Sequence, residues 1–304
     1  MVKQRTPEQP PLIVEIIRTV SWMKEFARKL RDENRIVGLV PTMGALHSGH
    51  LSLIKQARQQ CSSVVASIFV NPAQFGPSED FAKYPRTLAA DTEKLESARI
   101  QCLFLPEAKD IYPANYSTYV NVESLSERLE GRVRPGHFRG VSTVVMKLLQ
   151  IVQPQFAYFG RKDAQQAAII WRMAKDLNLD SQIVICPIER EPDGLAMSSR
   201  NVYLQAVDRQ AATVLHRALR AAQRLLQNGN REALSLQSAM HRVLKEESGA
   251  KVDYAEIVDA ETFESLTHIH RKAYVLIAAK FGETRLLDNM LVDFTDSGEL
   301  TTEL

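Results

Sequence analysis

Two histidines three residues apart, His47 and His50, are the side chains in this sequence best suited to chemistry. They end the segment VPTMGALHSGH, which spans residues 40–50. A mainly apolar run at 36–40 predicts a buried strand, and an amphipathic stretch from residue 51 predicts a helix. A glycine turn between a strand and a helix directs backbone N–H groups and the positive helix end toward an anion. The segment therefore predicts a phosphate-binding turn that carries two imidazoles.

Paired histidines can also bind zinc, which usually needs four donors and often uses cysteine pairs. The three cysteines, Cys61, Cys102 and Cys186, are far apart and lie in apolar runs, so the sequence does not favour zinc. The usual glycine-rich phosphate motifs are also absent, because no GxGxxG follows a strand and no Lys-Ser/Thr pair completes a P-loop. The HxGH element resembles instead the nucleotide-binding signature of the nucleotidyltransferase superfamily, whose members hold ATP phosphates with histidines.

A second polar segment, NPAQFG at 71–76, follows the apolar run at 64–70. Parallel sheets of α/β proteins bind ligands at the carboxyl ends of their strands. The Gln74 amide offers a donor and an acceptor, which suits a hydroxy acid. Taken alone, the segment is more typical of an ordinary surface loop than of a ligand site, and the loop continues through 83–87.

Three further polar segments contain cations. RVRPGHFRG at 132–140 precedes a helix predicted from Ser142, and it is either an anion site or a solvated basic loop. In FGRKDAQQ at 159–166, Lys162 would present an ammonium and Asp163 would either take ribose hydroxyls or cap a helix. REPDGLAMSSRN at 190–201 carries serines and Arg200, which could close over a triphosphate. We expect four of the five polar segments to follow parallel strands and the fifth to lie in a junction loop, so that all meet at one sheet edge.

The order of apolar patterns predicts an α/β fold with a Rossmann-like parallel sheet. Strands are predicted at 36–41, 64–70, 102–105, 156–160 and 183–188, with helices at 51–61, 88–99, 142–152 and 164–177 between them. The proline- and glycine-rich segment 107–141 is interpreted as an insertion with a short strand near 117–122. After residue 188 we predict helices at 207–226 and 231–247, then antiparallel strands at 252–259, 273–281 and 286–294 with a turn at 281–284.

This pattern divides the chain into a Rossmann-like domain at 1–188 and a smaller α+β domain at 189–304. Residues 1–11 are predicted to be a disordered leader. The 304 residues are 45% hydrophobic and carry a formal net charge of +2, which gives no indication of a nucleic-acid surface. No apolar run approaches membrane-spanning length, and three apparently unpaired cysteines fit a reducing compartment, so we predict a cytoplasmic protein.

Together the five polar segments resemble the pantothenate synthetase (pantoate–β-alanine ligase) family, from about residue 12 to 296. The matching strings are PTMGALHSGH, FVNPAQFG, RPGHFRGV, FGRKDAQQ and REPDGLAMSSRN. The resemblance implies that ATP and (R)-pantoate form pantoyl adenylate and pyrophosphate, after which β-alanine displaces AMP. It also implies Mg²⁺ carried on the ATP phosphates, a carboxyl-terminal lid domain and a homodimer, with no nucleic-acid or membrane partner.

The resemblance also implies roles for individual residues. The catalytic residues would be His50, His47, Lys162 and Arg200, and no residue is assigned to a protein-bound metal. Pantoate would contact Gln74 and Gln166, and β-alanine would lie beside Gln74. The ATP contacts would be Met43, Gly44, Ala45, Leu46, His47, Ser48, Gly49, His50, Gly160, Arg161, Lys162, Asp163, Glu189, Met197, Ser198, Ser199 and Arg200.

Two residues depart from the family pattern. Arg161 stands where the family usually has Glu or Gln, and Glu189 stands beside the adenine where an apolar residue or threonine is usual. Two alternatives stay open at this point: another HxGH nucleotidyltransferase, for example one that adenylates a phosphorylated pantetheine, and a non-catalytic nucleotide-binding module. No base for the β-alanine amine is evident, so water or a phosphate oxygen would take that proton.

Overall fold

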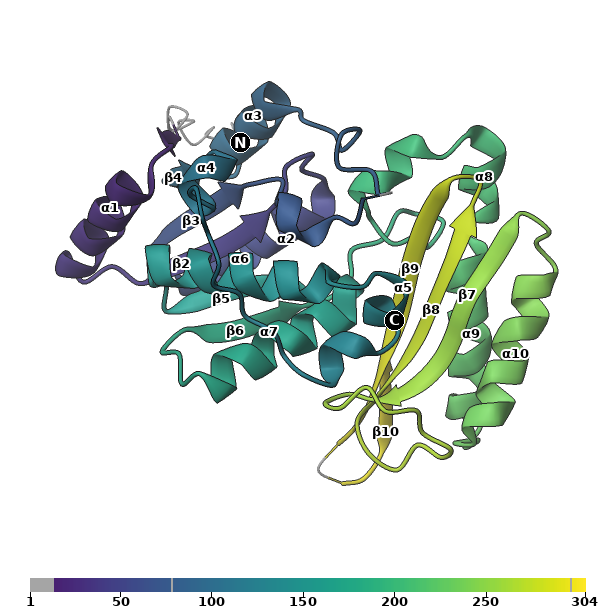
Figure 1. Ribbon diagram of the computed structural model, residues 1–304. Coiled ribbons are helices and arrows are strands. Elements are labelled where there is room, and N and C mark those ends of the chain that lie inside the picture. The colour runs from purple at the N-terminus through teal and green to yellow at the C-terminus, as the bar shows by residue number, and fades with distance from the viewer. Residues whose placement is uncertain (1–13, 78, 296) are drawn as a thin grey trace, which may run out of the picture.

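The computed structural model describes residues 14–77, 79–295 and 297–304, which form two sheets (Figure 1). The first sheet has six parallel strands in the order β1-β4-β3-β2-β5-β6. Their bounds are Glu15–Ile17 (β1), Val37–Thr42 (β2), Ser63–Ile68 (β3), Cys102–Phe104 (β4), Phe156–Gly160 (β5) and Gln182–Cys186 (β6). The predicted Rossmann-like sheet is therefore confirmed.

Helices cover both faces of this sheet because successive side chains of each strand point to opposite sides. Leu39 packs in one apolar cluster and Val40, the next residue of β2, packs in another. The first cluster includes residues of α1 (Val20–Asp32), α6 (His137–Val152) and α7 (Ala164–Asp176). The second includes residues of α2 (Ser48–Gln60) and α3 (Leu88–Ser97). Burial on both faces explains why these strands have continuous apolar sequences.

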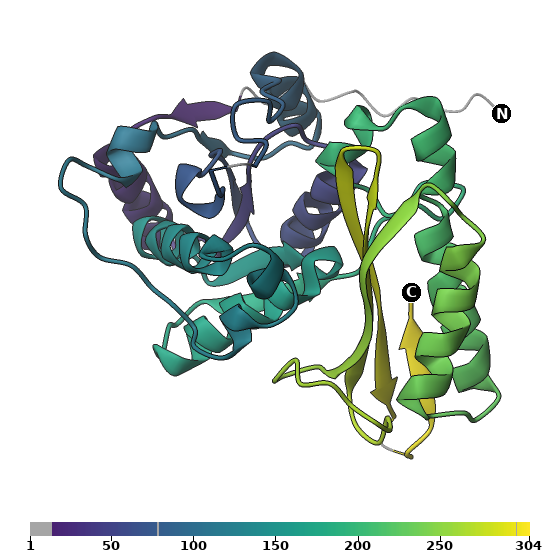
Figure 2. The same cartoon turned by 45° about the vertical axis from the view of Figure 1, so that its right-hand side comes forward.

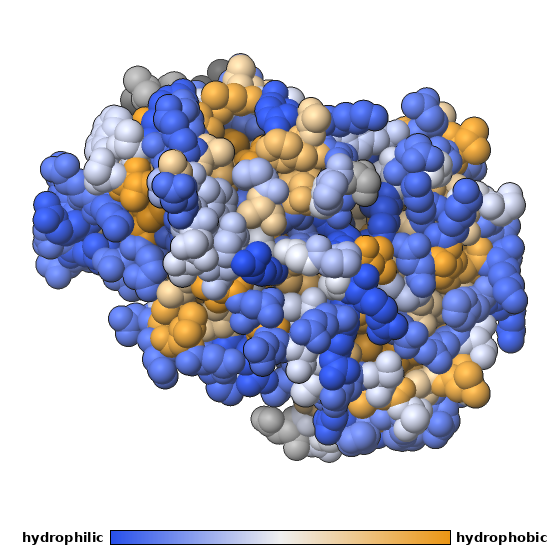
Figure 3. All heavy atoms as spheres, viewed as in Figure 1, coloured by the Kyte–Doolittle hydropathy of each residue, from blue (hydrophilic) through white to orange (hydrophobic). Residues whose placement is uncertain are grey.

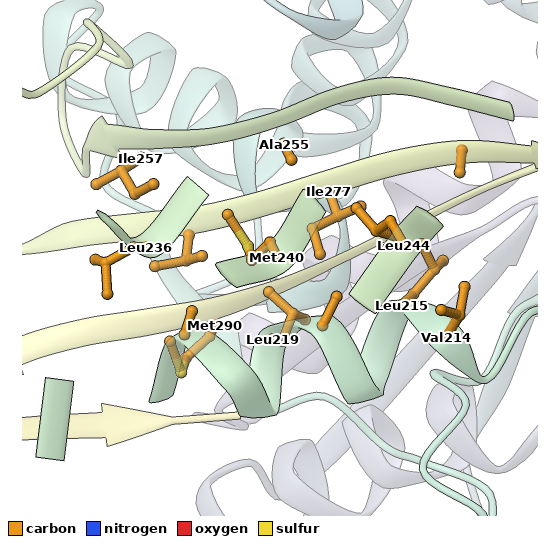
Figure 4. Close-up of a cluster of buried hydrophobic side chains, with 14 of the residues drawn as sticks. Val214, Leu215, Leu219, Leu236, Met240, Leu244, Ala255, Ile257, Ile277 and Met290 are labelled. Carbon is orange, nitrogen blue, oxygen red and sulfur yellow. The ribbon is translucent and has the colours of Figure 1, made fainter. Parts of the chain in front are cut away.

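The second sheet is antiparallel, with the order β10-β9-β8-β7. Its strands are Ala250–Asp259 (β7), Ala273–Phe281 (β8), Thr284–Phe294 (β9) and Leu300–Glu303 (β10). One face packs on α9 (Val214–Gln227) and α10 (Ala233–Lys245), where Leu219 and Met240 meet Ile277 and Met290 in one apolar cluster (Figure 4).

The other face of the antiparallel sheet packs against helices that cover the parallel sheet (Figure 2). Tyr274 and Leu276 of β8 share an apolar cluster with Phe138 of α6 and Ile169 of α7. The sheet is thus buried on both sides, and eight of the nine β8 residues are buried while only Lys280 is partly exposed. This packing joins the two sheets through side chains.

Short helical segments complete the chain between these elements. They include α4 (Ala108–Ile111), α5 (Glu130–Val133) and α8 (Ala206–Ala211). Four 3₁₀ turns, η1 to η4, lie at Pro72–Gln74, Leu125–Glu127, Arg161–Asp163 and Ser199–Tyr203.

The structure corrects several predicted elements. The strand near 117–122 does not form, because this segment makes no strand pairing in the described residues and Val120 N–H instead donates to Thr143 Oγ1 at 3.0 Å. The helix predicted from residue 142 begins earlier, at His137, and the helix predicted at 207–226 is divided into α8 and α9. The predicted leader at 1–11 lies outside the described residues.

Apart from the short helices α4 and α5 and the 3₁₀ turns, three elements were not predicted: β1, α1 and β10. Helix α1 buries Met23, Ala27 and Leu30, a spacing of four and three residues that is typical of an amphipathic helix. This spacing could have predicted α1. The two strands are only three and four residues long, too short to show a periodic pattern.

Helix α6 approaches η1 so closely that Gly140 has no room for a side chain. A Cβ on Gly140 would lie 2.1 Å from the carbonyl oxygen of Ala73 and 2.7 Å from the Cα of Gln74. We predict that Gly140→Ala lowers the free energy of unfolding in urea by about 1–3 kcal/mol, because overpacking forces the backbone apart.

The matched control is Gly249→Ala, whose added Cβ would lie no closer than 3.7 Å to another atom. This variant should unfold within about 0.5 kcal/mol of the unmodified protein. Equal stabilities for the two variants would contradict the close packing of α6 on η1.

Candidate active site

A cavity of about 220 Å³ lies at the carboxyl ends of four adjacent strands of the parallel sheet. Residues that directly follow β2, β3, β5 and β6 line it, among them Met43, Asn71, Lys162 and Pro187. From β2 the chain adds β3 and β4 on one side and β5 and β6 on the other, so the strand order reverses beside β2. This reversal is where open α/β sheets bind their ligands.

Most of the predicted site residues meet in this cavity. Those that line it are Met43, His47, Gly49, His50, Gln74, Gly160, Lys162, Asp163, Gln166, Glu189, Met197, Ser198, Ser199 and Arg200. Five predicted nucleotide contacts do not line it, namely Gly44, Ala45, Leu46, Ser48 and Arg161. The first three belong to the turn before the histidines, Ser48 is exposed, and the Arg161 side chain faces elsewhere.

The two histidines lie at the start of α2, where each side chain accepts a backbone N–H group. The Gly49 backbone N–H donates to His47 Nδ1 at 3.2 Å, and the His47 N–H donates to His50 Nδ1 at 3.4 Å. Each Nδ1 is therefore an acceptor, which leaves the ring proton of a neutral imidazole on Nε2. Gly49 has to lack a side chain because its Cβ would lie 2.9 Å from the His47 ring. The HxGH spacing thus presents two ring N–H donors at a helix N-terminus.

Both imidazoles are neutral at physiological pH. Burial and the Lys162 charge lower the pKa of His47 to about 4. Burial and the neighbouring His47 lower the pKa of His50 to about 3. The ring centroids are only 4.1 Å apart, so two imidazolium charges would repel each other strongly. These side chains can donate hydrogen bonds to phosphate without carrying charge.

A buried carboxylate, which the sequence did not reveal, holds the turn before the histidines. Asp91 of α3 is 1% exposed and accepts the N–H groups of Ala45 and Leu46 at 2.9 and 2.8 Å. Gly44 and Ala45 have φ angles of +83° and +49°, so this turn is left-handed. Lys94, also on α3, donates to the Leu46 carbonyl at 2.6 Å. Helix α3 therefore fixes the backbone that leads into His47.

Gln74 is oriented on three sides. Its Oε1 accepts from Asn71 Nδ2 at 3.0 Å, and its Nε2 donates to Met43 Sδ at 3.1 Å. Its backbone carbonyl accepts from His137 Nδ1 at 2.8 Å. The Asn71 Nδ2 also donates to the Gly140 carbonyl at 3.1 Å, which ties this turn to α6.

The basic segment 132–140 corrects an expectation, because it follows no strand of the sheet. Arg134 pairs with Glu79 at 2.6 Å and donates to His137 Nε2 at 3.0 Å, so its charge is already neutralised. Burial and the Arg134 charge lower the pKa of His137 to about 4. The exposed Arg139 stacks on the Tyr119 ring at 3.6 Å. Within this segment, Arg134 and His137 support Gln74 and are already engaged with protein groups.

Lys162 and Asp163 form the opposite wall of the cavity, in the 3₁₀ turn after β5. Lys162 Nζ lies 3.6 Å from Asp163 Oδ1. Burial opposes ionisation of Asp163, but the Lys162 and Arg200 charges outweigh burial and lower the pKa of its carboxyl group. The side chain of Asp163 makes no capping hydrogen bond to α7, so the alternative of an ordinary helix cap is wrong.

Arg200 reaches the cavity from the loop after β6, paired with Asp80. Its Nε and one terminal nitrogen donate to the two Asp80 oxygens, both at 3.1 Å. Ser199 Oγ donates to the Ala45 carbonyl at 3.4 Å, so the loop contacts the histidine turn. The Glu189 carbonyl accepts the Met197 N–H at 2.9 Å, while its side chain is exposed. To grip a phosphate, Arg200 has to exchange Asp80 for the ligand.

Arg161 turns away from the cavity toward the antiparallel sheet. The Arg161 side chain is 8% exposed, and its guanidinium pairs with Glu303 of β10. The first departure from the family pattern therefore places a cation between the two sheets and away from the cavity.

Sequence reasoning also missed an apolar wall and a phenol. The α6 residues Val141, Val144, Val145 and Leu148 line the cavity, as does the buried Tyr84. Twelve of the sixteen α6 residues are buried, so apolar side chains lie on more than one face and the sequence could not show which face meets a ligand. Tyr84 lies in residues 83–87, which were interpreted only as a continuation of the loop at 71–76.

The described residues 14–77, 79–295 and 297–304 contain no group of three or more His, Cys, Asp or Glu side chains that could hold a metal ion. None of the helices in these ranges is long and apolar enough to cross a membrane. Polar residues cover most of the face seen in Figure 1, with apolar residues in small groups between them (Figure 3).

Comparison with known proteins agrees with this geometry. The family model described as "Pantoate-beta-alanine ligase" matches residues 15–291. A pantothenate synthetase of Koribacter versatilis is 51% identical over 279 residues, which are 92% of this chain and 96% of the relative. One of Thermotoga petrophila is 50% identical over 279 residues, which are 92% of this chain and 100% of the relative.

Solved structures are similar over the same length. The pantothenate synthetase of Thermus thermophilus superimposes with a TM-score of 0.87 and 43% identity, over 91% of this chain and 98% of that one. A pantoate–β-alanine ligase of Francisella tularensis, solved with "Beta-gamma ATP and Beta-alanine", gives a TM-score of 0.74 and 34% identity. The alignment covers 91% of this chain and 97% of that structure.

The lowered pKa values of His47, His50 and His137 predict that acid destabilises the fold. An unfolded histidine takes up a proton near pH 6.5, whereas these folded histidines stay neutral to about pH 4 or below. The stability that the fold gains from keeping these histidines neutral is therefore fully present above pH 6.5 and is lost as the pH falls toward 4. His137→Gln should reduce this loss by about 1 kcal/mol per pH unit between pH 6 and 5.

The measurement is urea denaturation at several pH values, with His241→Gln as the control because His241 is exposed on α10. The control should keep the slope of the unmodified protein. If the His137 and control variants gave the same slope, His137 would be charged in the folded protein.

Proposed function

The chain belongs to the pantoate–β-alanine ligase family, and we propose that its cavity at the carboxyl ends of β2, β3, β5 and β6 is the site where pantoate is adenylated. Its activity is the ATP-dependent ligation of pantoate to β-alanine. The observation that carries the proposed site is the placement of the histidine turn after β2 and the Lys162 turn after β5 on either side of the reversal in strand order. Family membership disfavours the two alternatives, a pantetheine-phosphate adenylyltransferase and a non-catalytic module.

In the proposed first step, a carboxylate oxygen of pantoate attacks the α-phosphorus of ATP. The new bond joins this oxygen to phosphorus, and the bond from phosphorus to pyrophosphate breaks. The carboxylate is already ionised, so no protein base is needed, and catalysis consists of positioning and charge stabilisation. His47 and His50 supply neutral N–H donors, while Lys162 and Arg200 supply positive charge.

In the second step, the β-alanine amine attacks the acyl carbon of pantoyl adenylate. The carbon–oxygen bond to AMP breaks, and the amine loses a proton to water or to a phosphate oxygen. Gln74 supports both steps in this proposal because its amide is held at the cavity wall by Asn71 and Met43. Gln166 contacts pantoate from the first turn of α7. The apolar side of α6 suits the methyl groups that pantoate carries.

For ATP, we propose that Gly160, Asp163 and the turn after β2 contact the nucleoside, and that residues 197–200 cover the phosphates. The residues Gly44, Ala45, Leu46 and Ser48 would act through the backbone of that turn. Mg²⁺ would arrive on the ATP phosphates, where it neutralises charge. A magnesium ion carried in this way would bind through the phosphates and its own waters, so it needs no group of protein carboxylates, and the described residues contain no group of three or more His, Cys, Asp or Glu side chains that could hold a metal ion.

Three wider proposals complete this view. Residues 1–188 and 189–304 are proposed as two domains, with the second closing over ATP. A homodimer is proposed, which light scattering would measure. Cytoplasmic localisation is proposed in agreement with three buried free cysteines, Cys61, Cys102 and Cys186.

The order of the chemistry predicts that pyrophosphate exchanges into ATP with pantoate present and β-alanine absent. The adenylate is formed before the amine is needed, so labelled pyrophosphate should appear in ATP only when pantoate is added. With all three substrates, AMP should be the nucleotide product by chromatography. ADP as the product, or exchange that requires β-alanine, would contradict the adenylate mechanism.

The role of Arg200 predicts that Arg200→Ala slows adenylate formation in a single turnover by about a hundredfold, because a charged contact to the phosphates is lost. Circular dichroism should show an unchanged fold, since Arg200 lies in the 3₁₀ turn η4, which contains no buried residue.

The matched control is Arg209→Ala, which removes an arginine of α8 that is paired with Glu191 and Asp193 and does not line the cavity. The control should react at close to the unmodified rate. An unchanged rate for Arg200→Ala would remove residues 197–200 from the site.

A further inference from the structure

A buried asparagine of the antiparallel sheet holds the turn that carries Lys162. Asn289 of β9 is completely buried, and its Nδ2 donates to two successive carbonyls. The Asn289–Arg161 distance is 2.9 Å and the Asn289–Lys162 distance is 2.8 Å. Both amide hydrogens of the side chain are therefore used on the backbone of one 3₁₀ turn.

The neighbouring residue of β9 holds the loop on the other side of the cavity. Asp288 is 2% exposed and accepts from two nitrogens of Arg190, at 2.7 and 3.0 Å. Arg190 in turn donates to the Gly194 carbonyl at 3.0 Å, within the loop that leads to Arg200. The Asn289 N–H donates to Asp288 Oδ1 at 2.8 Å, which links the two anchors. Two adjacent residues of the second sheet thus tie down both loops that bring cations to the cavity.

The Lys162 turn depends on this support because it has little of its own. The turn is three residues long, and Asp163 makes no side-chain cap for the following helix. In the described part of the chain, the one ion pair of Lys162 is the 3.6 Å contact with Asp163. A lysine side chain is a flexible stem of four carbons, so its ammonium is placed largely by its backbone. A shift of the turn by about 1 Å would misplace this charge.

We propose that Asn289 is a positioning residue for adenylation, which acts by holding the backbone of Arg161 and Lys162 so that the Lys162 ammonium meets the ATP phosphates. Only an amide fits this position, because an aspartate would turn a carboxylate toward two carbonyl oxygens. The Asn289 Oδ1 is buried and has no hydrogen-bond partner among the described residues. Asn289 also lines a second cavity, of about 40 Å³, together with Gln165 and Gln166. The role of the Asn289 amide is thus to supply two N–H donors to this turn.

This inference rests on the proposed role of Lys162, and a double-mutant cycle separates the two. The rate of adenylate formation is measured in a single turnover at saturating ATP and pantoate, for the unmodified protein, Asn289→Ala, Lys162→Ala and the double variant. Asn289→Ala should lower the rate at least about tenfold in the unmodified background. In the Lys162→Ala background the same change should lower it by less than about threefold, because the group it positions is gone.

The matched control is Gln223→Leu, which removes another buried amide at a distance from the cavity. Gln223 lies on α9, is 8% exposed and donates to Thr302 Oγ1 at 2.8 Å. This variant should keep the unmodified rate, even if it unfolds at lower urea concentration. Asn289→Ser serves as a milder second variant with a shorter polar side chain, and it should show a smaller version of the same defect.

Several results would overturn the inference. One is an equal fold-loss from Asn289→Ala with and without Lys162, which would indicate a general structural effect. Another is an unmodified rate in both Asn289 variants. Failure of both Asn289 variants to fold would assign this residue to stability alone. If Lys162→Ala itself reacted normally, the proposed role of Lys162 would be wrong, a result that is distinct from a failure of the Asn289 arm.

Discussion

The burial of the antiparallel sheet on both faces is the constraint on which the rest of the structure depends. One face is covered by α9 and α10, and the other by α6, α7 and the segments around them. Apolar burial contributes about 25 cal/mol per Å², and the buried side chains of Tyr274, Leu276 and Phe138 in this contact fix the second sheet against the first. Because β9 is held there, Asp288 and Asn289 reach the loops of the parallel sheet.

The cavity residues are then held mainly by bonds to their backbone. Asp91 receives the N–H groups of the histidine turn, His137 donates to the Gln74 carbonyl, and Asn289 donates to the carbonyls of the Lys162 turn. Each supporting side chain is buried, and each comes from a different element. Buried polar groups are costly when unpaired, so these contacts specify one conformation for each turn. The side chains that give these turns their shape are thus different from those that line the cavity.

This division explains what the sequence could predict. The strands, the helices after them and the polar segments of the cavity follow from local patterns. The HxGH and Lys162 turns directly follow β2 and β5, Gln74 lies in the turn after β3, and Arg200 lies in the segment after β6. The supporting residues could not be predicted, because their partners are distant in sequence: Asp91 lies 46 residues from Ala45, and Asn289 lies 127 from Lys162. A lone buried Asp or Asn has no sequence pattern. The supporting role of the basic segment 132–140 could not be predicted for the same reason, since Glu79, which neutralises Arg134, is 55 residues away.

The neutral histidines also determine where the charge for the reaction has to come from. His47 and His50 are packed too closely for both to be protonated, and burial favours their uncharged forms. In the mechanism that we propose, their contribution to phosphate binding is directional, through Nε2–H groups set by the helix N-terminus. The positive charge is left to Lys162 and Arg200, both of which are paired with carboxylates in the free protein. In this proposal the two neutral donors keep their positions when the nucleotide binds. Lys162 and Arg200 exchange their carboxylate partners for the phosphates.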